Sequence, residues 1–314
     1  MELDYARLDP ELALILPALP AALADIHRGN IADVRDMMDG QPATAIETDV
    51  VISERTIAGP AGDLPLVTYR RPSKDVQPCL LWIHGGGYLF GTARDDRARR
   101  IAEHLDCTVI SVEYRLAPEH PFPAGPDDCF AALEWVAANA DELKIDVSRL
   151  AIGGASAGGG MAAGLALMNR DRGGPEITFQ LLLYPMIDNF HDTPSGQCTN
   201  NPVWNRKTSF NAWEMYLGGE PGKDASPYAA AARATDLTSL PPAYICVGGE
   251  DLFRDEDIEY AQRLMAAGVA CELSVYPGLF HGGDMFLPDA KVSQRLERGL
   301  THALGQRLGI LPTR

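Results

Sequence analysis

The chain has 314 residues and a formal net charge of −16 at pH 7, with 46% hydrophobic and 22% charged residues. These proportions are ordinary for a globular protein with a sizeable core, and the length fits one large α/β domain or two smaller ones. The negative charge opposes binding to nucleic acid and to anionic membranes, so we expect neither as a partner.

The first stretch, up to about residue 45, is expected to be helical. Its apolar residues recur at helical spacing, with two prolines among them: Leu12, Ile15, Leu16, Leu19, Leu23 and Ile26, interrupted by Pro17 and Pro20. The chain begins Met1-Glu2-Leu3-Asp4 rather than with a basic start and an apolar core, and no apolar run reaches membrane-spanning length. We therefore expect a cytoplasmic protein with no signal peptide and no membrane insertion.

Strands and helices are expected to alternate after this stretch. Two strands between Thr48 and Arg71 flank Ala-Gly-Pro-Ala-Gly-Asp at 58–63, which is a hairpin signal. Further strands are predicted at 79–83, 109–112, 150–152, 179–183, 243–247 and 271–276, with helices near 98–105 and 127–138, after residue 156, and at the end of the chain. This alternation predicts an α/β fold with a mostly parallel sheet covered on both faces, whose ligands bind at the carboxyl ends of the strands.

A run of three glycines follows the strand at 79–83, as His84-Gly85-Gly86-Gly87. Glycines at a strand end let the backbone approach a ligand closely and leave N–H groups free to point at it. A developing oxyanion needs such donors. We expect Gly86 and Gly87 to form an oxyanion hole together with Ala157, whereas a flexible turn is the plain alternative.

The most informative local pattern is Gly154-Ala155-Ser156-Ala157-Gly158, which lies between the strand at 150–152 and a helix-forming run of small residues. A Gly-x-Ser-x-Gly pattern in this context is typical of a nucleophile elbow, a strained turn that exposes the serine hydroxyl. Side chains two residues to either side would collide there, which explains the glycines. We expect Ser156 to be a nucleophile.

A nucleophilic serine needs a histidine and an acid, which follow it in the chain in this class of fold. Three histidines follow Ser156. His281 lies on a glycine-flanked loop just past the strand at 271–276, whereas His191 lies in an irregular stretch and His302 on the expected terminal helix. The loop position favours His281 as the base.

For the acid, Asp251 follows the strand at 243–247 on a loop from which a carboxylate can orient an imidazole, and Glu250 is its nearest rival. Asp255 and Asp257 are interpreted as ordinary carboxylates in the first turn of the next helix, where the helix dipole favours them.

The alternation stops between residues 188 and 223, where an aromatic-rich segment carries Trp204, Phe210, Trp213 and Tyr216. Aromatic segments above an active site form lids or substrate walls, and a packed connecting helix is the alternative. The six cysteines, at positions 79, 107, 129, 198, 246 and 271, show no paired spacing, so we expect free thiols and no metal site.

Taken together, these motifs resemble the hormone-sensitive-lipase-like branch of the α/β-hydrolases, a family of bacterial esterases. The resemblance runs from about Val50 to the terminal helix and adds five further matches: the stretch from Tyr114 to Ala124, Leu183-Tyr184-Pro185, Ser226-Pro227-Tyr228, Leu240-Pro241-Pro242 and the run from Asp251 to Glu256. It implies a catalytic triad of Ser156, Asp251 and His281. It also implies a helical cap made of residues 1–45 and 188–223, over a core of residues 46–187 and 224–314.

The chain departs from the family pattern at two points. Ala155 precedes the serine where the family has Asp or Thr, so a hydrogen bond that supports the elbow is missing or replaced. Leu252-Phe253 replaces the usual Pro-Leu after the acid, which changes the expected shape of that loop.

The sequence therefore predicts a serine carboxylesterase that hydrolyses a small-molecule ester of short or medium acyl length, with no metal and no cofactor. We expect Tyr88, Tyr184 and Trp213 to contact the substrate. Hydrolysis of amides or carbamates, or acyl transfer, by the same triad is an alternative, as is a noncatalytic receptor on the same fold. The sequence leaves a homodimer open.

Overall fold

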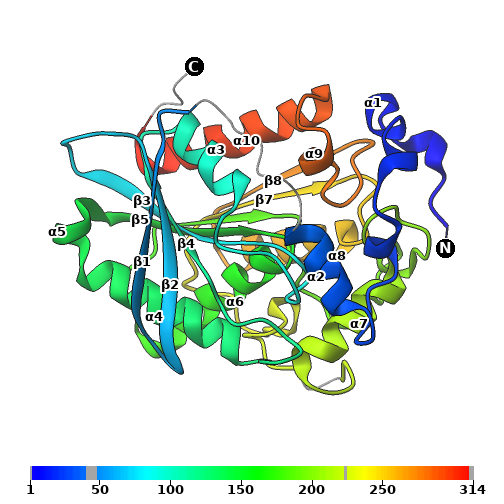
Figure 1. Cartoon of the computed structure of the whole chain (residues 1–314), viewed down its shortest axis with the longest axis horizontal. Coiled ribbons are helices and arrows are strands. Elements are labelled where there is room, and N and C mark those ends of the chain that lie inside the picture. Colours follow the sequence, from blue (N-terminus) through cyan, green and yellow to red (C-terminus); the bar gives the residue numbers. More distant parts are fainter. Residues whose placement is uncertain (1, 40–47, 223–224, 311–314) are drawn as a thin grey trace.

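A computed structural model describes residues 2–39, 48–222 and 225–310. The expected cap boundaries at residues 45 and 223 lie outside these described residues. One sheet crosses the molecule in the strand order β1-β2-β4-β3-β5-β6-β7-β8 (Figure 1). Its strands are β1 Val51–Gly59, β2 Gly62–Arg70, β3 Gln77–Ile83, β4 Thr108–Val112, β5 Ile145–Ala155, β6 Phe179–Leu183, β7 Ala243–Gly248 and β8 Cys271–Tyr276.

The sheet is parallel from β4 to β8 and antiparallel only at the edge formed by β1 and β2. The β1–β2 hairpin closes where Gly59 pairs with Gly62, within the predicted turn at 58–63. The expectation of a mostly parallel sheet with an N-terminal hairpin is confirmed.

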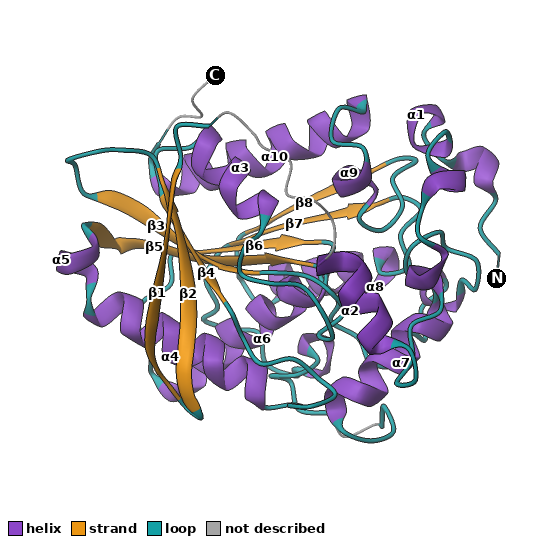
Figure 2. Cartoon of the chain, viewed as in Figure 1, coloured by secondary structure: helices purple, strands orange, loops and turns teal. Residues whose placement is uncertain are grey.

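Helices cover both faces of this sheet (Figure 2). α3 Asp96–His104 and α10 Lys291–Leu308 lie on one face, and α4 Ala124–Ala138, α6 Ala157–Arg172 and α8 Arg254–Ala266 lie on the other. Strands that are covered on both sides have no solvent face, which is why every residue of β3, β4, β6 and β7 is buried. Two single-turn helices, α5 Ala140–Leu143 and α9 Gly283–Phe286, lie in the connections.

The N-terminal segment is a series of short helical pieces rather than one helix. These are the 3₁₀ helices Tyr5–Arg7, Leu16–Ala18 and Ala21–Ala24, and the α-helices α1 Pro10–Ala13 and α2 Ile31–Asp39. Pro17 and Pro20 each lie at the start of one of these pieces, because proline fits the first turn of a helix but breaks its interior.

This N-terminal segment lies beside the aromatic-rich segment, at the carboxyl end of the sheet (Figure 1). The aromatic-rich segment contains the 3₁₀ turn Ser195–Gln197 and α7 Arg206–Leu217. Asn205 Nδ2 and Asn211 Nδ2 donate to the carbonyl oxygens of Ala24 and Ile26, at 2.7 and 2.8 Å. The two segments therefore form one bonded layer above the strand ends, although their division from the core as a cap stays a prediction.

Candidate active site

Ser156 lies at the junction of β5 and α6 with φ 56° and ψ −120°, a strained conformation for a residue with a side chain. Its N–H donates to the carbonyl oxygen of Leu183 on β6, at 2.9 Å. The turn has no room for side chains on either side: a Cβ on Gly154 would lie 2.4 Å from the Gly158 backbone, and one on Gly158 would lie 2.0 Å from the Ile83 oxygen. The glycines of the predicted elbow are therefore required by sterics.

The structure brings Ser156, His281 and Asp251 together from three different strand ends. Ser156 Oγ lies 2.8 Å from His281 Nε2, and His281 Nδ1 lies 2.9 Å from Asp251 Oδ2. A carboxylate only accepts, so Nδ1 carries a proton and donates to Asp251. In that tautomer Nε2 has a free lone pair, and it accepts the hydrogen bond from the serine hydroxyl.

The carboxylate of Asp251 is held by its own loop. Asp251 is 2% exposed, and its Oδ1 accepts from the Phe253 N–H at 2.9 Å while Oδ2 faces the histidine. Phe253 also packs edge-on against the His281 ring, with 4.8 Å between centroids. The loop Leu252-Phe253, where the chain departs from the family pattern, thus orients both the carboxylate and the imidazole.

A buried cluster of charged side chains links the loop after His281 to α3 and α10, which lie on the same face of the sheet. Arg97 on α3 pairs with Asp284 on α9, three residues past His281, and also with Glu297 on α10. Arg97 and Asp284 are almost completely buried, so each charge depends on its partner for compensation. Nothing in the local sequence around Arg97 indicates this contact, because its partners come from the last 31 residues of the chain.

The triple-glycine loop lies directly beside the elbow. His84 stacks on Tyr114 with 4.2 Å between centroids, and Tyr114 Oη donates to the His84 carbonyl oxygen. Gly86 and Gly87 have φ of +116° and +60°, which glycine adopts without strain. Among the described residues, no protein acceptor takes the N–H of either glycine. The loop therefore presents two free donors, and the first turn of α6, which starts at Ala157, leaves further N–H groups unpaired.

The three residues expected to contact substrate are all buried. Tyr88 stacks on Tyr216 at 3.8 Å, tilts against Trp213 and donates to the Met186 carbonyl oxygen. Tyr184 packs edge-on against the ring of His281, with 5.1 Å between centroids, and is the one of the three for which a ring contact with His281 is observed. Contact of these three residues with substrate stays a prediction.

Trp204 also lies beside His281, although the sequence analysis did not name it as a substrate contact. Its ring centroid is 6.3 Å from that of His281, and a Cβ on Gly87 would lie 2.1 Å from its Cη2. Trp204 is 3% exposed and its indole N–H has no partner among the described residues. It therefore covers the glycine loop from the aromatic-rich segment. Only its presence among the aromatic residues of that segment pointed to it.

The rival carboxylates lie away from the imidazole. Glu250 Oε1 pairs with Arg7 at 2.9 Å, and burial raises its pKa. Asp255 pairs with Arg254 at 2.7 Å and is partly exposed.

The interpretation of Asp257 as an ordinary first-turn carboxylate is wrong: it is fully buried, and neither of its oxygens has a hydrogen-bond partner within the described chain. Burial, and then the neighbouring Glu256, raise the pKa of Asp257 well above its usual range.

His281, and neither of the two other histidines, is the histidine hydrogen-bonded to Ser156 in the described part of the chain. His302 is exposed on α10. His191 is fully buried, with Nδ1 3.5 Å from Glu256 Oε2, and burial together with the cationic Arg206 lowers its pKa to about 3. Burial likewise raises the pKa of Glu256 well above its usual range, so burial disfavours the charged form of both side chains.

All six cysteines are free, as expected, and only Cys271 is not fully buried. Within the described part of the chain, no three or more His, Cys, Asp or Glu side chains are arranged to hold a metal ion. None of the helices described is long and apolar enough to cross a membrane.

The eight-stranded, mostly parallel sheet with helices on both faces has the α/β-hydrolase fold, and a family profile described as alpha/beta hydrolase fold matches residues 80–285. The chain is 38% identical to Esterase LipI of Mycobacterium tuberculosis over 287 residues (89% of this chain, 88% of LipI). It is 39% identical to Carboxylesterase NlhH of the same species over 288 residues (88% of each). Among solved structures, Bacterial Heroin Esterase is similar with a TM-score of 0.90 and 39% identity, over 97% of this chain and 99% of that one. The chain belongs to the hormone-sensitive-lipase-like family of α/β-hydrolases.

Proposed function

We propose that this protein is a serine carboxylesterase that cleaves small esters through an acyl-enzyme on Ser156. One observation carries the proposal: the chain of two hydrogen bonds, 2.8 and 2.9 Å long, from Ser156 through His281 to Asp251. The names of its relatives agree, since LipI is an esterase and LipN of M. tuberculosis, 35% identical over 89% of this chain and 78% of LipN, is a carboxylic ester hydrolase.

In the first half-reaction, His281 Nε2 takes the Ser156 proton as Oγ attacks the acyl carbon. Asp251 holds the imidazole in the tautomer that leaves Nε2 free, and it stabilises the imidazolium that forms. His281 then gives this proton to the leaving alcohol. Water, activated by the same histidine, releases the acid and regenerates the serine.

The oxyanion of the tetrahedral intermediate needs donors that are already in place. The unpaired N–H groups of Gly86 and Gly87 are suited to this role because they lie beside the serine on a loop fixed by His84 and Tyr114. The N–H of Ala157, at the first position of α6, supplies a third donor, and the positive end of the helix dipole adds to it.

The proposed substrates are esters of short or medium acyl chains. Support comes from the covered site, where Ser156 is only 9% exposed beneath Trp204 and the aromatic-rich segment. Ethyl Acetate Hydrolase of Pseudomonas putida, 30% identical over 78% of this chain and 79% of its own length, is named for a short ester. Tyr88, Tyr184 and Trp213 stay proposed as substrate contacts, and Trp204 joins them.

Four further expectations belong to this proposal. Residues 1–45 and 188–223 act as a cap over a core of residues 46–187 and 224–314. The protein is cytoplasmic, does not bind nucleic acid, and needs no metal or cofactor. A homodimer is compatible with this activity.

The test is hydrolysis of p-nitrophenyl butyrate by the wild-type protein and by Ser156→Ala, with folding checked by circular dichroism. We expect activity in the wild type and almost none in the variant. A noncatalytic receptor would leave both inactive, whereas a folded variant that retains a tenth of the activity would show that another residue is the nucleophile.

A further inference from the structure

The aromatic-rich segment contacts the loop of the catalytic acid as well as covering the serine. The residues on either side of Asp251, Glu250 and Leu252, have carbonyl oxygens that both accept hydrogen bonds from side chains of that segment. Asn201 Nδ2 donates to Glu250 O at 2.8 Å, and Ser195 Oγ donates to Leu252 O at 2.9 Å. Both donors are buried, with exposed fractions of 3 and 4%.

The Leu252–Phe253 peptide group joins Ser195 to the acid directly. Its C=O accepts from Ser195 Oγ, and its N–H, on Phe253, donates to Asp251 Oδ1. The second oxygen of the same carboxylate accepts from His281. A peptide group that accepts at its oxygen becomes a stronger donor at its nitrogen, so the bonds along this chain reinforce one another.

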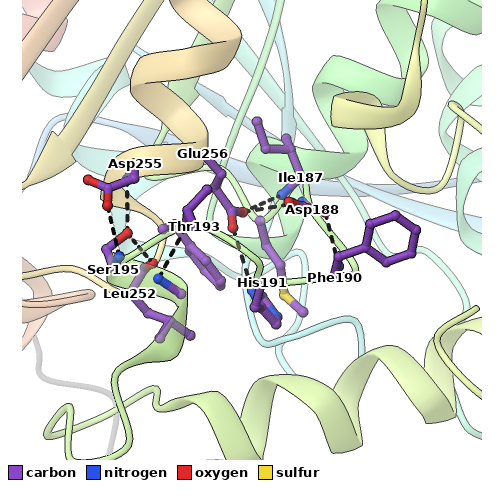
Figure 3. A network of polar contacts seen from close by, with 12 residues as sticks. Ile187, Asp188, Phe190, His191, Thr193, Ser195, Leu252, Asp255 and Glu256 are labelled. Atoms are coloured by element: carbon purple, nitrogen blue, oxygen red, sulfur yellow. Dashed lines mark hydrogen bonds and ion pairs between the residues drawn. The ribbon is translucent and has the colours of Figure 1, made fainter. Parts of the chain in front are cut away.

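Ser195 is itself held in place by Asp255. The Asp255 N–H donates to Ser195 Oγ at 3.0 Å, and the Ser195 N–H donates to Asp255 Oδ2 at 2.8 Å (Figure 3). With its oxygen accepting from Asp255, the single hydroxyl proton of Ser195 is directed at Leu252 O. The two residues are 60 positions apart in the chain, so this pair fixes the aromatic-rich segment to the start of α8.

We infer that Ser195 is a positioning residue for the catalytic acid: it fixes the Leu252–Phe253 peptide group that orients Asp251 toward His281. The inference rests on the proposed function, since it needs Asp251 to be the acid of the triad. The hydrogen bonds of Ser195 go to Asp255 and Leu252 rather than to Ser156 or His281, so its loss should lower turnover while leaving substrate binding intact.

The experiment compares Ser195→Ala with a matched control, Ser209→Ala. Ser209 is a fully buried serine of the same segment, on α7, and its hydroxyl has no partner among the described residues. We expect Ser195→Ala to lower kcat roughly fivefold to tenfold, the loss that one net hydrogen bond corresponds to, with KM within about twofold. Ser209→Ala should keep both constants within about twofold, and Ser195→Thr, which retains the hydroxyl, should restore most of kcat.

A second readout separates positioning from general loss of structure. The His281 Nδ1 proton, held against a carboxylate, should give a proton NMR signal far downfield of the amide signals, identified by its absence in Asp251→Ala. In Ser195→Ala this signal should shift or broaden through faster exchange with water, and in Ser209→Ala it should not. An unchanged signal, or a kcat loss equal to that of Ser209→Ala, overturns the inference.

If Ser195→Ala does not fold, Ser195→Cys replaces it, because a thiol fills a similar volume but is a weaker donor. Full kcat in Ser195→Cys then contradicts the inference, and an intermediate loss supports it. Failure of the proposed function is distinguishable from either outcome: the wild-type protein would then lack esterase activity altogether.

Discussion

Changing Asp251 to Asn should abolish nearly all turnover, because the structure dictates how the introduced amide must lie. The Phe253 N–H points at Oδ1 at 2.9 Å and needs an acceptor, so the amide oxygen takes that position. The amide NH₂ is then directed at His281 Nδ1, where the carboxylate accepts in the wild type. A donor there forces Nδ1 to accept, which moves the imidazole proton to Nε2 and leaves no base for Ser156.

The wrong tautomer corresponds to a loss of about ten-thousandfold in kcat, or about 5 kcal/mol of transition-state stabilisation. Steady-state hydrolysis of p-nitrophenyl butyrate at neutral pH measures it. Asp255→Asn and Glu250→Gln are the control variants. Asp255→Asn keeps an acceptor for the Ser195 N–H and should cost about 1 kcal/mol of stability. Glu250→Gln should weaken only the ion pair with Arg7. If either neighbour were the crippling change, or if Asp251→Asn kept a tenth of kcat, the assignment of the acid would be wrong.

Three further predictions concern the nucleophile, the substrate and a buried carboxylate. Ser156→Ala should lower kcat roughly a millionfold and leave some catalysis from the oxyanion hole, as measured on p-nitrophenyl butyrate. Butyryl esters should exceed palmitoyl esters in kcat/KM, with no activation at an oil–water interface. Because the pKa of Asp257 is raised in the folded state, its contribution to stability falls as pH rises above about 4 toward that raised pKa. The variant Asp257→Asn has no carboxyl to ionise and so does not lose this stability. The free energy of unfolding of the variant minus that of the wild type should therefore increase with pH, by at most about 1.4 kcal/mol per pH unit. Urea titrations at pH 5 and pH 7 measure this difference.

A different result would contradict each of these three predictions. Substantial residual activity in a folded Ser156→Ala variant would remove the elbow serine from the mechanism. Higher kcat/KM on palmitoyl esters would mean that the covered site opens to long chains. A difference in unfolding free energy that is flat or decreasing between pH 5 and 7 would mean that Asp257 is ionised when buried.

The central strands of this architecture are predictable from the sequence because they are largely apolar runs. The expected strands at 79–83, 179–183 and 243–247 lie within β3, β6 and β7, in which every residue is buried. Burial on both faces of a parallel sheet requires such runs, and the glycine motifs mark where the strands end. The elbow is predictable for the same reason: no residue larger than glycine fits at positions 154 and 158.

The parts that the sequence does not predict depend on contacts between distant segments. Asp257 has the sequence context of a solvated helix start, yet it is completely buried, which only the packing of α8 reveals. The N-terminal stretch has helical spacing, but its prolines divide it into short pieces. Ser195 and Trp204 lie in a segment without regular periodicity, and their contacts with Leu252 and Gly87 follow from how that segment folds over the sheet.

The most direct test of the central claim is covalent labelling with a fluorophosphonate probe followed by peptide mass spectrometry. The probe reacts only with a serine that a working base activates. We predict a single adduct, on the peptide that contains Ser156, that is absent in Ser156→Ala and forms far more slowly in His281→Ala. An adduct on any other serine, or no adduct on the folded wild-type protein, would contradict the account.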